Sequence, residues 1–381
     1  WHRIMEFDLS WILLGLPLAF GLGWMASRLD WRQLRLENRH APKAYFRGLN
    51  FLLNEQQDKA IDAFIEAVQN DPDTSELHFA LGNLFRRRGE YERAVRVHEH
   101  LLSRADLGEA DRQRAQHALA LDFLKAGLLD RAEAALRKLY GTPFESEAAI
   151  ALLAIYERSR DWPQAAEIAS HLEASGQGQF GVRRAHYLCE QAAKAAPDQA
   201  LDLLKQANAV AGETPRPGIE LAALQLQQGK AEDAFQTLVA TARKAPGAMP
   251  LLAKPMTVAA KACHREPEAR QILSENYAQT ATLDVMDALV TLDEGHGTPR
   301  EWYLRHLERE PSLIAAAQWI AGEKLEHEQF HPQVQRALDH AVKPLSRYRC
   351  AACGFEARQH FWQCPGCQSW DSYPARRVEE L

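Results

Sequence analysis

A period of 34 residues runs through the middle of this chain and constrains its fold more than any other feature. Gly48 and Gly82 are 34 residues apart, and so are Ala60 and Ala94. Between these small residues, apolar residues recur every three or four positions, as on the buried face of an α-helix. A unit of this length cannot bury its apolar face alone, so consecutive units are expected to stack on one another.

The residues within each unit match the tetratricopeptide pattern, in which two helices touch at small residues and a proline ends the second helix. We therefore predict an all-α, superhelical tetratricopeptide-repeat solenoid over residues 43–345, with a concave groove of the kind that binds protein segments. The residues that carry the pattern are Gly48, Phe51, Ala60, Phe64, Ala67 and Pro72; Leu81, Gly82, Phe85, Ala94, His98 and Leu101; Phe123, Ala132 and Leu136; Tyr156, Ala165 and Leu172; Ala200, Leu204 and Ala207; and Ala234, Leu238 and Pro246.

Four cysteines near the C-terminus form two Cys-x-x-Cys pairs, Cys350 with Cys353 and Cys364 with Cys367. Two such turns facing each other supply four thiolates to one tetrahedral metal ion. Gly354 follows the first pair, where a left-handed backbone closes the turn. We predict one tetrathiolate-bound ion, iron or zinc, because such sites accept both. The alternative, two disulfides, is disfavoured if this end of the chain lies in a reducing cytosol.

The cysteines lie in a short module, residues 346–381, which resembles rubredoxin-type knuckles and zinc ribbons. A segment this small cannot form a stable hydrophobic core without a metal ion or disulfides, so we expect the metal to provide its folding energy. Only a few residues separate Pro344 from Tyr348, so the module should stay close to the last helices. Its expected aromatic core consists of Phe355, Phe361, Trp362, Trp370 and Tyr373.

The N-terminal region predicts a transmembrane helix over residues 9–27, which are almost entirely apolar. Trp11 and Trp24 lie near its two ends, where amphipathic rings favour the membrane interface. A basic juxtamembrane helix is expected over residues 28–42, and its positive charge places the bulk of the chain on the cytoplasmic side. A cleaved signal peptide fits less well, because no clear small-x-small cleavage site follows the apolar run. The basic residues are Arg28, Arg32, Arg35 and Arg39.

One motif could indicate an enzyme: His327 to His331 match His-Glu-x-x-His, the signature of zinc metalloproteases. That chemistry needs both histidines on one continuous helix. Pro332 directly follows the second histidine, so we expect the helix to end there. Because no other catalytic motif is found, we predict that the protein is not an enzyme. Cys189 and Cys263 are interpreted as small buried hydrophobic residues.

The cysteine module is also compatible with two other functions. A rubredoxin-like iron site could transfer single electrons or sense metal, although no second redox centre is evident in the sequence. The arginines of the module suggest a nucleic-acid contact, but solubilising charge on a small domain explains them better, and the net charge of −6 argues against a solenoid that binds nucleic acid. We therefore expect no nucleic-acid partner. The basic residues in question are Arg347, Arg349, Arg358, Arg376 and Arg377.

The order of these parts resembles the lipopolysaccharide assembly protein B family of bacteria. The resemblance implies an inner-membrane protein of Gram-negative bacteria that limits lipopolysaccharide synthesis. Members promote degradation of the deacetylase LpxC by the membrane protease FtsH, and they associate with other lipopolysaccharide-assembly proteins. The residues that carry the resemblance are Gly48–Asn54, Gln56–Ala60, Leu81–Arg86, Tyr348–Cys350, Cys353–Phe355 and Trp362–Cys367.

Overall fold

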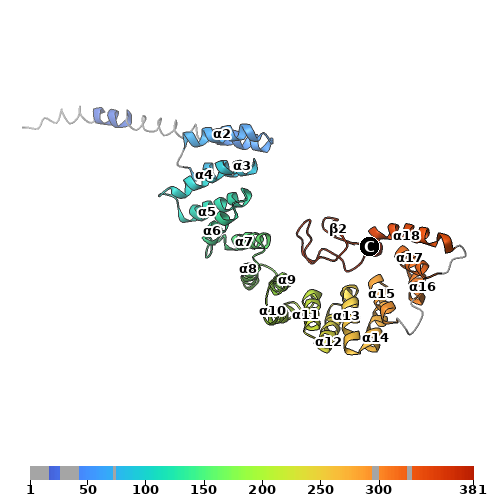
Figure 1. Cartoon of the computed structure of the whole chain (residues 1–381). Helices are drawn as coiled ribbons and strands as arrows, with labels where there is room; N and C mark the ends of the chain where they lie inside the picture. Colours follow the sequence, from blue (N-terminus) through green and yellow to red (C-terminus); the bar gives the residue numbers. More distant parts are fainter. Residues whose placement is uncertain (1–16, 26–42, 72–73, 294–299, 324–327) are drawn as a thin grey trace, which may run out of the picture. The chain divides into compact units, whose positions relative to one another are not determined.

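A computed structural model of the chain describes residues 17–25, 43–71, 74–293, 300–323 and 328–381 (Figure 1). Within these ranges the chain is helical almost throughout. The strands found there are β1 (Tyr348–Arg349) and β2 (Glu356–Ala357), which pair antiparallel. The chain divides into two compact units, Trp1–Ile155 and Tyr156–Leu381. The predicted helical array and its C-terminal metal-binding module are both present.

The first unit is a series of antiparallel helix pairs. After the helical residues 17–25, the next described helix of this unit covers residues 43–53. The helices that follow are α2 (Gln57–Asn70), α3 (Ser75–Arg87), α4 (Tyr91–Ser103), α5 (Glu109–Lys125), α6 (Leu129–Arg137) and α7 (Glu145–Ser159), which crosses into the second unit.

Small residues lie where the paired helices touch, as the 34-residue period predicts. Ala60, Ala94 and Ala132 have no exposed surface. At Gly82 in α3 the fit is tightest, because a Cβ atom there would lie only 2.5 Å from the imidazole Nε2 of His98. Any larger side chain at this position would push the two helices apart, so glycine sets their spacing. Pro72, the expected end of the first pair, lies outside the described residues.

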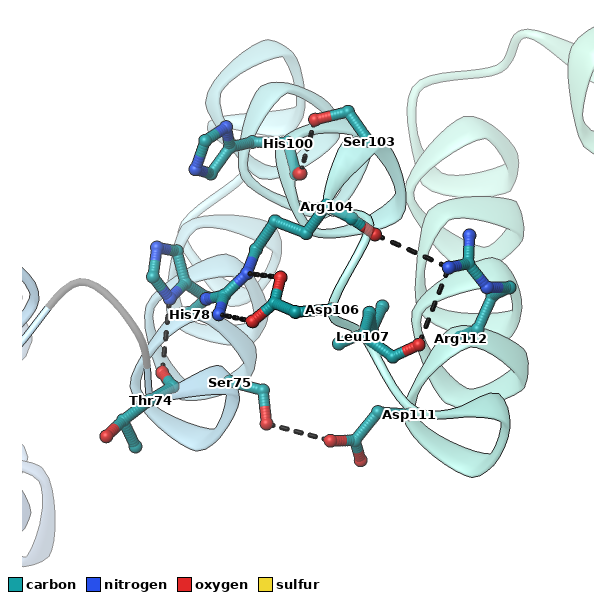
Figure 2. A network of polar contacts seen from close by, with 10 residues as sticks. All are labelled: Thr74, Ser75, His78, His100, Ser103, Arg104, Asp106, Leu107, Asp111 and Arg112. Carbon is teal, nitrogen blue, oxygen red and sulfur yellow. Dashed lines mark hydrogen bonds and ion pairs between the residues drawn. The ribbon is translucent and has the colours of Figure 1, made fainter.

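Polar contacts fix the connection between α4 and α5 (Figure 2). Arg104 donates to both oxygens of Asp106, at 3.1 and 2.6 Å, and this ion pair lowers the pKa of the Asp106 carboxyl. The guanidinium of Arg112 points back at the loop carbonyls of Arg104 and Leu107. The loop therefore holds its own backbone in place before the next helix pair begins.

A buried charge network joins three successive helices of this unit. Asp122 in α5 is fully buried and accepts hydrogen bonds from His98 Nδ1 in α4, at 2.5 Å, and from Arg86 Nη1 in α3, at 2.8 Å. His98 is equally buried, and its other nitrogen has no hydrogen-bond partner among the residues that the structure describes. Buried charges require such pairing, because desolvation penalises each ion that is left alone.

The second unit continues the array and ends in the cysteine module. Its helices are α8 (Trp162–Ala174), α9 (Gly181–Ala192), α10 (Pro197–Val210), α11 (Pro215–Gln227), α12 (Ala231–Lys244), α13 (Met249–Cys263), α14 (Glu266–Gln279), α15 (Leu283–Leu292), α16 (Arg300–Arg309), α17 (Leu313–Ala321) and α18 (His331–Leu345), with short 3-10 helices η1 (Pro246–Ala248), η2 (Glu328–Phe330) and η3 (Val378–Glu380).

The predicted alanine and leucine anchors of this unit are buried, whereas Pro246 is exposed at the start of η1. Ala165, Ala207 and Ala234 have no exposed surface, which confirms them as helix contacts. Cys189 is also fully buried, as predicted, whereas Cys263 is only half-buried at the end of α13. The burial expected for Cys263 is therefore wrong in degree, since the last turn of a helix is partly open to solvent.

The predicted transmembrane helix over 9–27 is described only for residues 17–25, which are helical. The rest of that span and the predicted basic helix over 28–42 lie outside the described residues. Among the residues that the structure does describe, no helix has both the length and the apolar character needed to cross a membrane.

The metalloprotease-like motif does not form one continuous α-helix in its described part. Glu328–Phe330 is the 3-10 helix η2, and α18 begins at His331 with Pro332 in its first turn. The expectation that a helix ends at His331 is therefore wrong, because proline is well suited to the start of a helix. The His331 ring contacts the backbone oxygen of Ile320 at 3.1 Å. His327 lies outside the described residues.

Candidate metal centre

The first cysteine pair sits in a tight turn closed by two backbone hydrogen bonds. The N–H of Gly354 donates to the carbonyl of Cys350, and the N–H of Cys350 donates to the carbonyl of Phe355, both at 2.9 Å. Gly354 has φ +78°, the left-handed conformation predicted for this position. The turn presents the sulfur atoms of Cys350 and Cys353 to the same side.

The second pair repeats this geometry. The N–H of Gln368 donates to the carbonyl of Cys364 at 2.8 Å, and the N–H of Cys364 donates to the carbonyl of Ser369 at 2.9 Å. Gln368 has φ +62° and occupies the position of Gly354 in the first turn. A left-handed backbone is unusual for glutamine and is normally indicated by glycine. The residue type at position 368 therefore does not predict that the second turn has the same backbone as the first.

The four sulfur atoms converge on one point. All of them lie within 4.8 Å of one another, with Cys350 and Cys367 at 3.8 Å and Cys353 and Cys364 at 3.7 Å. A tetrahedral ion with metal–sulfur bonds of about 2.3 Å separates its ligands by about 3.8 Å. No disulfide links these cysteines. The donor set and its spacing support a tetrathiolate site for one metal ion, with iron and zinc both compatible.

Hydroxyl groups beside the sulfur atoms favour the thiolate form that binds metal. Burial raises the pKa of Cys350, but its hydrogen bonds with the Ser372 hydroxyl and with nearby backbone N–H groups outweigh burial and lower the pKa to about 6. Hydrogen bonding with the hydroxyl and the backbone N–H of Ser369 lowers the pKa of Cys367. Both cysteines are therefore prepared to lose their protons to an incoming cation.

The pKa of Cys353 shifts in the opposite direction. The backbone N–H of Phe355 lowers its pKa, but burial and hydrogen bonding with the neighbouring thiols raise the value to about 12. Four adjacent thiolates repel one another when nothing balances them. A divalent or trivalent cation at their centre removes that repulsion, which is a further reason why this arrangement suits a metal.

Trp370 attaches the module to the solenoid. Its ring stacks on His186 of α9, with centroids 4.8 Å apart and planes at 18°, and meets Trp162 and Tyr187 edge-on. Its Nε1 donates to Glu157 at 3.2 Å. The expectation that Trp370 belongs to a core within the module is therefore wrong. Phe355, another expected core residue, is 44% exposed, while Tyr373 is buried as predicted and Phe361 packs beside it.

A chain of polar groups runs from Asp371 into the solenoid. The Asp371 carboxylate contacts His186 Nε2 at 2.8 Å, and His186 Nδ1 lies 3.4 Å from the guanidinium of Arg216. A guanidinium only donates hydrogen bonds, so Nδ1 accepts and Nε2 carries the proton given to Asp371. Arg216 is held in turn by Glu190 at 2.8 Å and Glu220 at 2.6 Å. The module therefore docks through charge as well as through stacking.

The last residues of the chain cap two solenoid helices. Glu380 accepts from the backbone N–H of Leu283, at 2.8 Å, where α15 begins. Glu379 accepts from the hydroxyl of Ser312 at 2.7 Å and from the N–H of Leu313 at 2.6 Å, where α17 begins. Carboxylates stabilise helix N-termini because unpaired N–H groups and the helix dipole meet there. Nothing in the sequence analysis singled out these two glutamates.

The basic residues of the module are largely used within the chain. Arg377 pairs with both carboxylate oxygens of Asp284, at 2.6 and 2.9 Å. Arg349 donates twice to Glu356, and Arg347 lies 3.6 Å from the same carboxylate. Structural pairing, more than binding of a nucleic acid, therefore accounts for these arginines.

Comparison with known proteins identifies the module. Residues 348–373 match the family model described as the rubredoxin metal binding domain. Among solved structures, the chain is similar to "Structure of Naa15/Naa10 bound to HypK-THB", at 13% identity and a TM-score of 0.48, over 80% of this chain and 47% of that one. This similarity is too low to support any inference.

Curated relatives extend over the whole chain. Lipopolysaccharide assembly protein B of Escherichia coli K12 is 31% identical, over 98% of this chain and 100% of the relative. The protein of the same name from Haemophilus influenzae is 27% identical, over 95% of this chain and 96% of the relative. Because the Escherichia coli relative is 31% identical over nearly the whole of both chains, the chain belongs to the lipopolysaccharide assembly protein B family.

Proposed function

We propose that this protein is a non-enzymatic, membrane-anchored adaptor in lipopolysaccharide assembly. The observation that carries the proposal is the docking of the metal module on the solenoid, through Trp370 on His186 and through the tail on α15 and α17. Two modules fixed together in this way offer one continuous surface to a partner. The names of the relatives support the process in which that surface acts.

In this proposal, Cys350, Cys353, Cys364 and Cys367 are the ligands of one iron or zinc ion, and the ion supplies folding energy to residues 346–381. The repeats occupy residues 43–345, and α18 ends at Leu345, next to that boundary. An anchor over 9–27 places the adaptor at the cytoplasmic face of the inner membrane. The finer role follows from the family resemblance: the adaptor promotes FtsH-dependent degradation of LpxC and contacts other lipopolysaccharide-assembly proteins.

Undocking the metal module tests the proposal. Trp370→Ala, combined with Arg377→Ala, Glu379→Ala and Glu380→Ala and with a long Gly/Ser insertion after Pro344, removes the stacking and tail contacts together. It should lengthen the LpxC half-life about twofold or more, because the two modules no longer share one surface. The half-life is measured after translation is stopped. Phe355→Ala is the matched control, since this exposed aromatic of the same module lies outside the docking contacts described above. Normal LpxC turnover in the undocked variant would refute the composite surface.

Deleting residues 1–27 should release a soluble, folded protein that no longer regulates LpxC at native expression. Partners confined to one membrane meet at a raised effective concentration, and that advantage is lost with the anchor. Cell fractionation follows the location of the protein, and LpxC abundance follows its activity. Full rescue by the truncated form would show that no tether is needed.

The absence of catalysis has its own test. Glu328→Gln should leave LpxC turnover unchanged and should not alter the protein in a proteolysis assay with casein. The reason is that Glu328 lies in a 3-10 helix and not on the continuous α-helix that a zinc protease requires. A protease activity of the purified chain that disappears with this single change would contradict the adaptor assignment.

A further inference from the structure

A cavity of about 360 Å³ lies at the seam between the metal module and the solenoid, within the second unit. The module contributes His360, Trp362, Asp371 and Tyr373 to its wall. The solenoid contributes side chains from the starts of α9, α11 and α13, among them Glu213 and Leu251. The cavity therefore exists only while the module is docked.

The aromatic part of the wall is fixed in position. The rings of His360 and Trp362 pack edge to face, with centroids 4.7 Å apart and planes at 70°. Tyr373 is buried and lies edge-on to His360. Rings with a negative face attract cations, especially when they are held rigidly and partly shielded from water.

The polar groups of the wall provide acceptors. His360 Nε2 contacts the carbonyl of Tyr373 at 3.1 Å, so this nitrogen carries the proton and Nδ1 is an acceptor, which receives no hydrogen bond from the described part of the chain. Burial lowers the pKa of His360, which keeps the ring neutral. The Oδ2 atom of Asp371 accepts the hydrogen bond from His186, and its Oδ1 atom has no hydrogen bond from the described residues. Glu213 is exposed at the rim.

Asp371 is also held in a strained backbone conformation, with φ +48°. Its N–H donates to the carbonyl of Trp362 at 2.9 Å, which keeps the carboxylate between His186 and the cavity. Strain of this kind persists only where the surroundings impose it, and it is typical of binding sites.

The charged side chains that line the cavity are acidic, and the ammonium group of Lys244 lies outside the lining, beside Gly212. Among the described residues that line it there are two carboxylates, Glu213 and Asp371, and no lysine or arginine. The buried guanidinium of Arg216, which contacts His186, already pairs with Glu190 and Glu220. A ligand that fits this site must therefore be cationic, rich in hydrogen-bond donors and flat enough to lie against an aromatic wall.

We propose that the seam cavity binds an arginine side chain presented by a polypeptide segment of a partner protein. The guanidinium offers five donors in a plane and stacks on aromatic rings, which matches Asp371, Glu213 and His360 Nδ1 beside Trp362. The aliphatic stem of the arginine would lie against Leu251. The inference deepens the proposed adaptor function, on which it rests for the existence of a partner.

The test uses the full chain and a blocked pentapeptide, acetyl-Ala-Leu-Arg-Leu-Ala-amide, in a calorimetric titration. We expect a dissociation constant below about 1 mM, and at least about tenfold weaker binding of the same peptide with citrulline in place of arginine, since citrulline keeps the shape and loses the charge. Glu213→Gln should weaken arginine-peptide binding about threefold or more, and Glu213→Lys should abolish it. Glu308→Gln, an exposed carboxylate on α16, is the matched control and should change nothing.

Three results would overturn the proposal. They are no binding of the arginine peptide up to about 5 mM, equal binding of the citrulline peptide, and binding that survives Glu213→Lys. The last would place the peptide elsewhere on the chain. Because the titration is performed on purified protein, its failure is separate from a failure of the adaptor function, which is judged by the half-life of LpxC.

Discussion

Cys350→Ser and Cys367→Ser should each remove the bound metal ion and unfold the last 30 or so residues, while α8 to α17 remain helical. Binding of structural zinc contributes on the order of 10–16 kcal/mol in zinc-finger peptides, far more than the small aromatic cluster of this module can replace. Elemental analysis gives the metal content, far-UV circular dichroism gives the helix content, and limited proteolysis locates the unfolded segment.

Cys263→Ser is the control for that experiment. Cys263 is a free, half-buried thiol far from the four converging sulfur atoms, so this variant should keep one ion per chain and resist proteolysis like the parent protein. If both cysteine variants kept the metal content of the parent protein, the assignment of the metal site would be wrong. Unfolding that spreads through the whole second unit would show instead that the docked module supports the solenoid beyond its own contacts.

Asp122→Ala should destabilise the first unit by about 3–5 kcal/mol, because it leaves the buried His98 and Arg86 without their shared partner. The Asp122 side chain is fully buried, and solvent cannot replace its hydrogen bonds. Thermal and urea unfolding of the full chain, followed by circular dichroism, give the change in stability. Asp122→Asn should cost less, since an amide oxygen still accepts from one of the two donors.

An exposed aspartate–arginine ion pair serves as the control for the buried Asp122 network. Asp58 is paired with Arg88, but its side chain is 80% exposed. Asp58→Ala should change the free energy of unfolding by less than about 1 kcal/mol, as is usual for surface ion pairs. If both alanine variants proved equally mild, the buried network would not be a structural element of this unit.

The features that could be predicted from the sequence are those that depend only on neighbouring residues in the chain. The 34-residue period identified the alanines at the helix contacts, because close packing admits only small residues there and leaves a regular trace in the sequence. The spacing of Cys350, Cys353, Cys364 and Cys367 identified the metal site, because a Cys-x-x-Cys turn presents two sulfur atoms without help from the rest of the fold.

The docking of the module could not be predicted in this way. Trp370 and His186 are 184 residues apart in the sequence, and nothing near either residue shows that they stack. Arg377 was interpreted as solubilising charge because its partner, Asp284, lies in a distant helix. Long-range partners leave no periodic signal, so an aromatic or charged residue is assigned by default to its own neighbourhood.

The contacts of Trp370 and the tail also affect how the protein is made. Helical repeats contact only their sequence neighbours, so they can fold one after another as the chain leaves the ribosome. Trp370 instead reaches back to Glu157, 213 residues earlier, and Glu380 reaches back to Leu283, 97 residues earlier. The second unit therefore cannot close until translation has finished. A nascent or prematurely terminated chain leaves the aromatic surface around Trp162 uncovered, where chaperones and proteases can recognise an incomplete product.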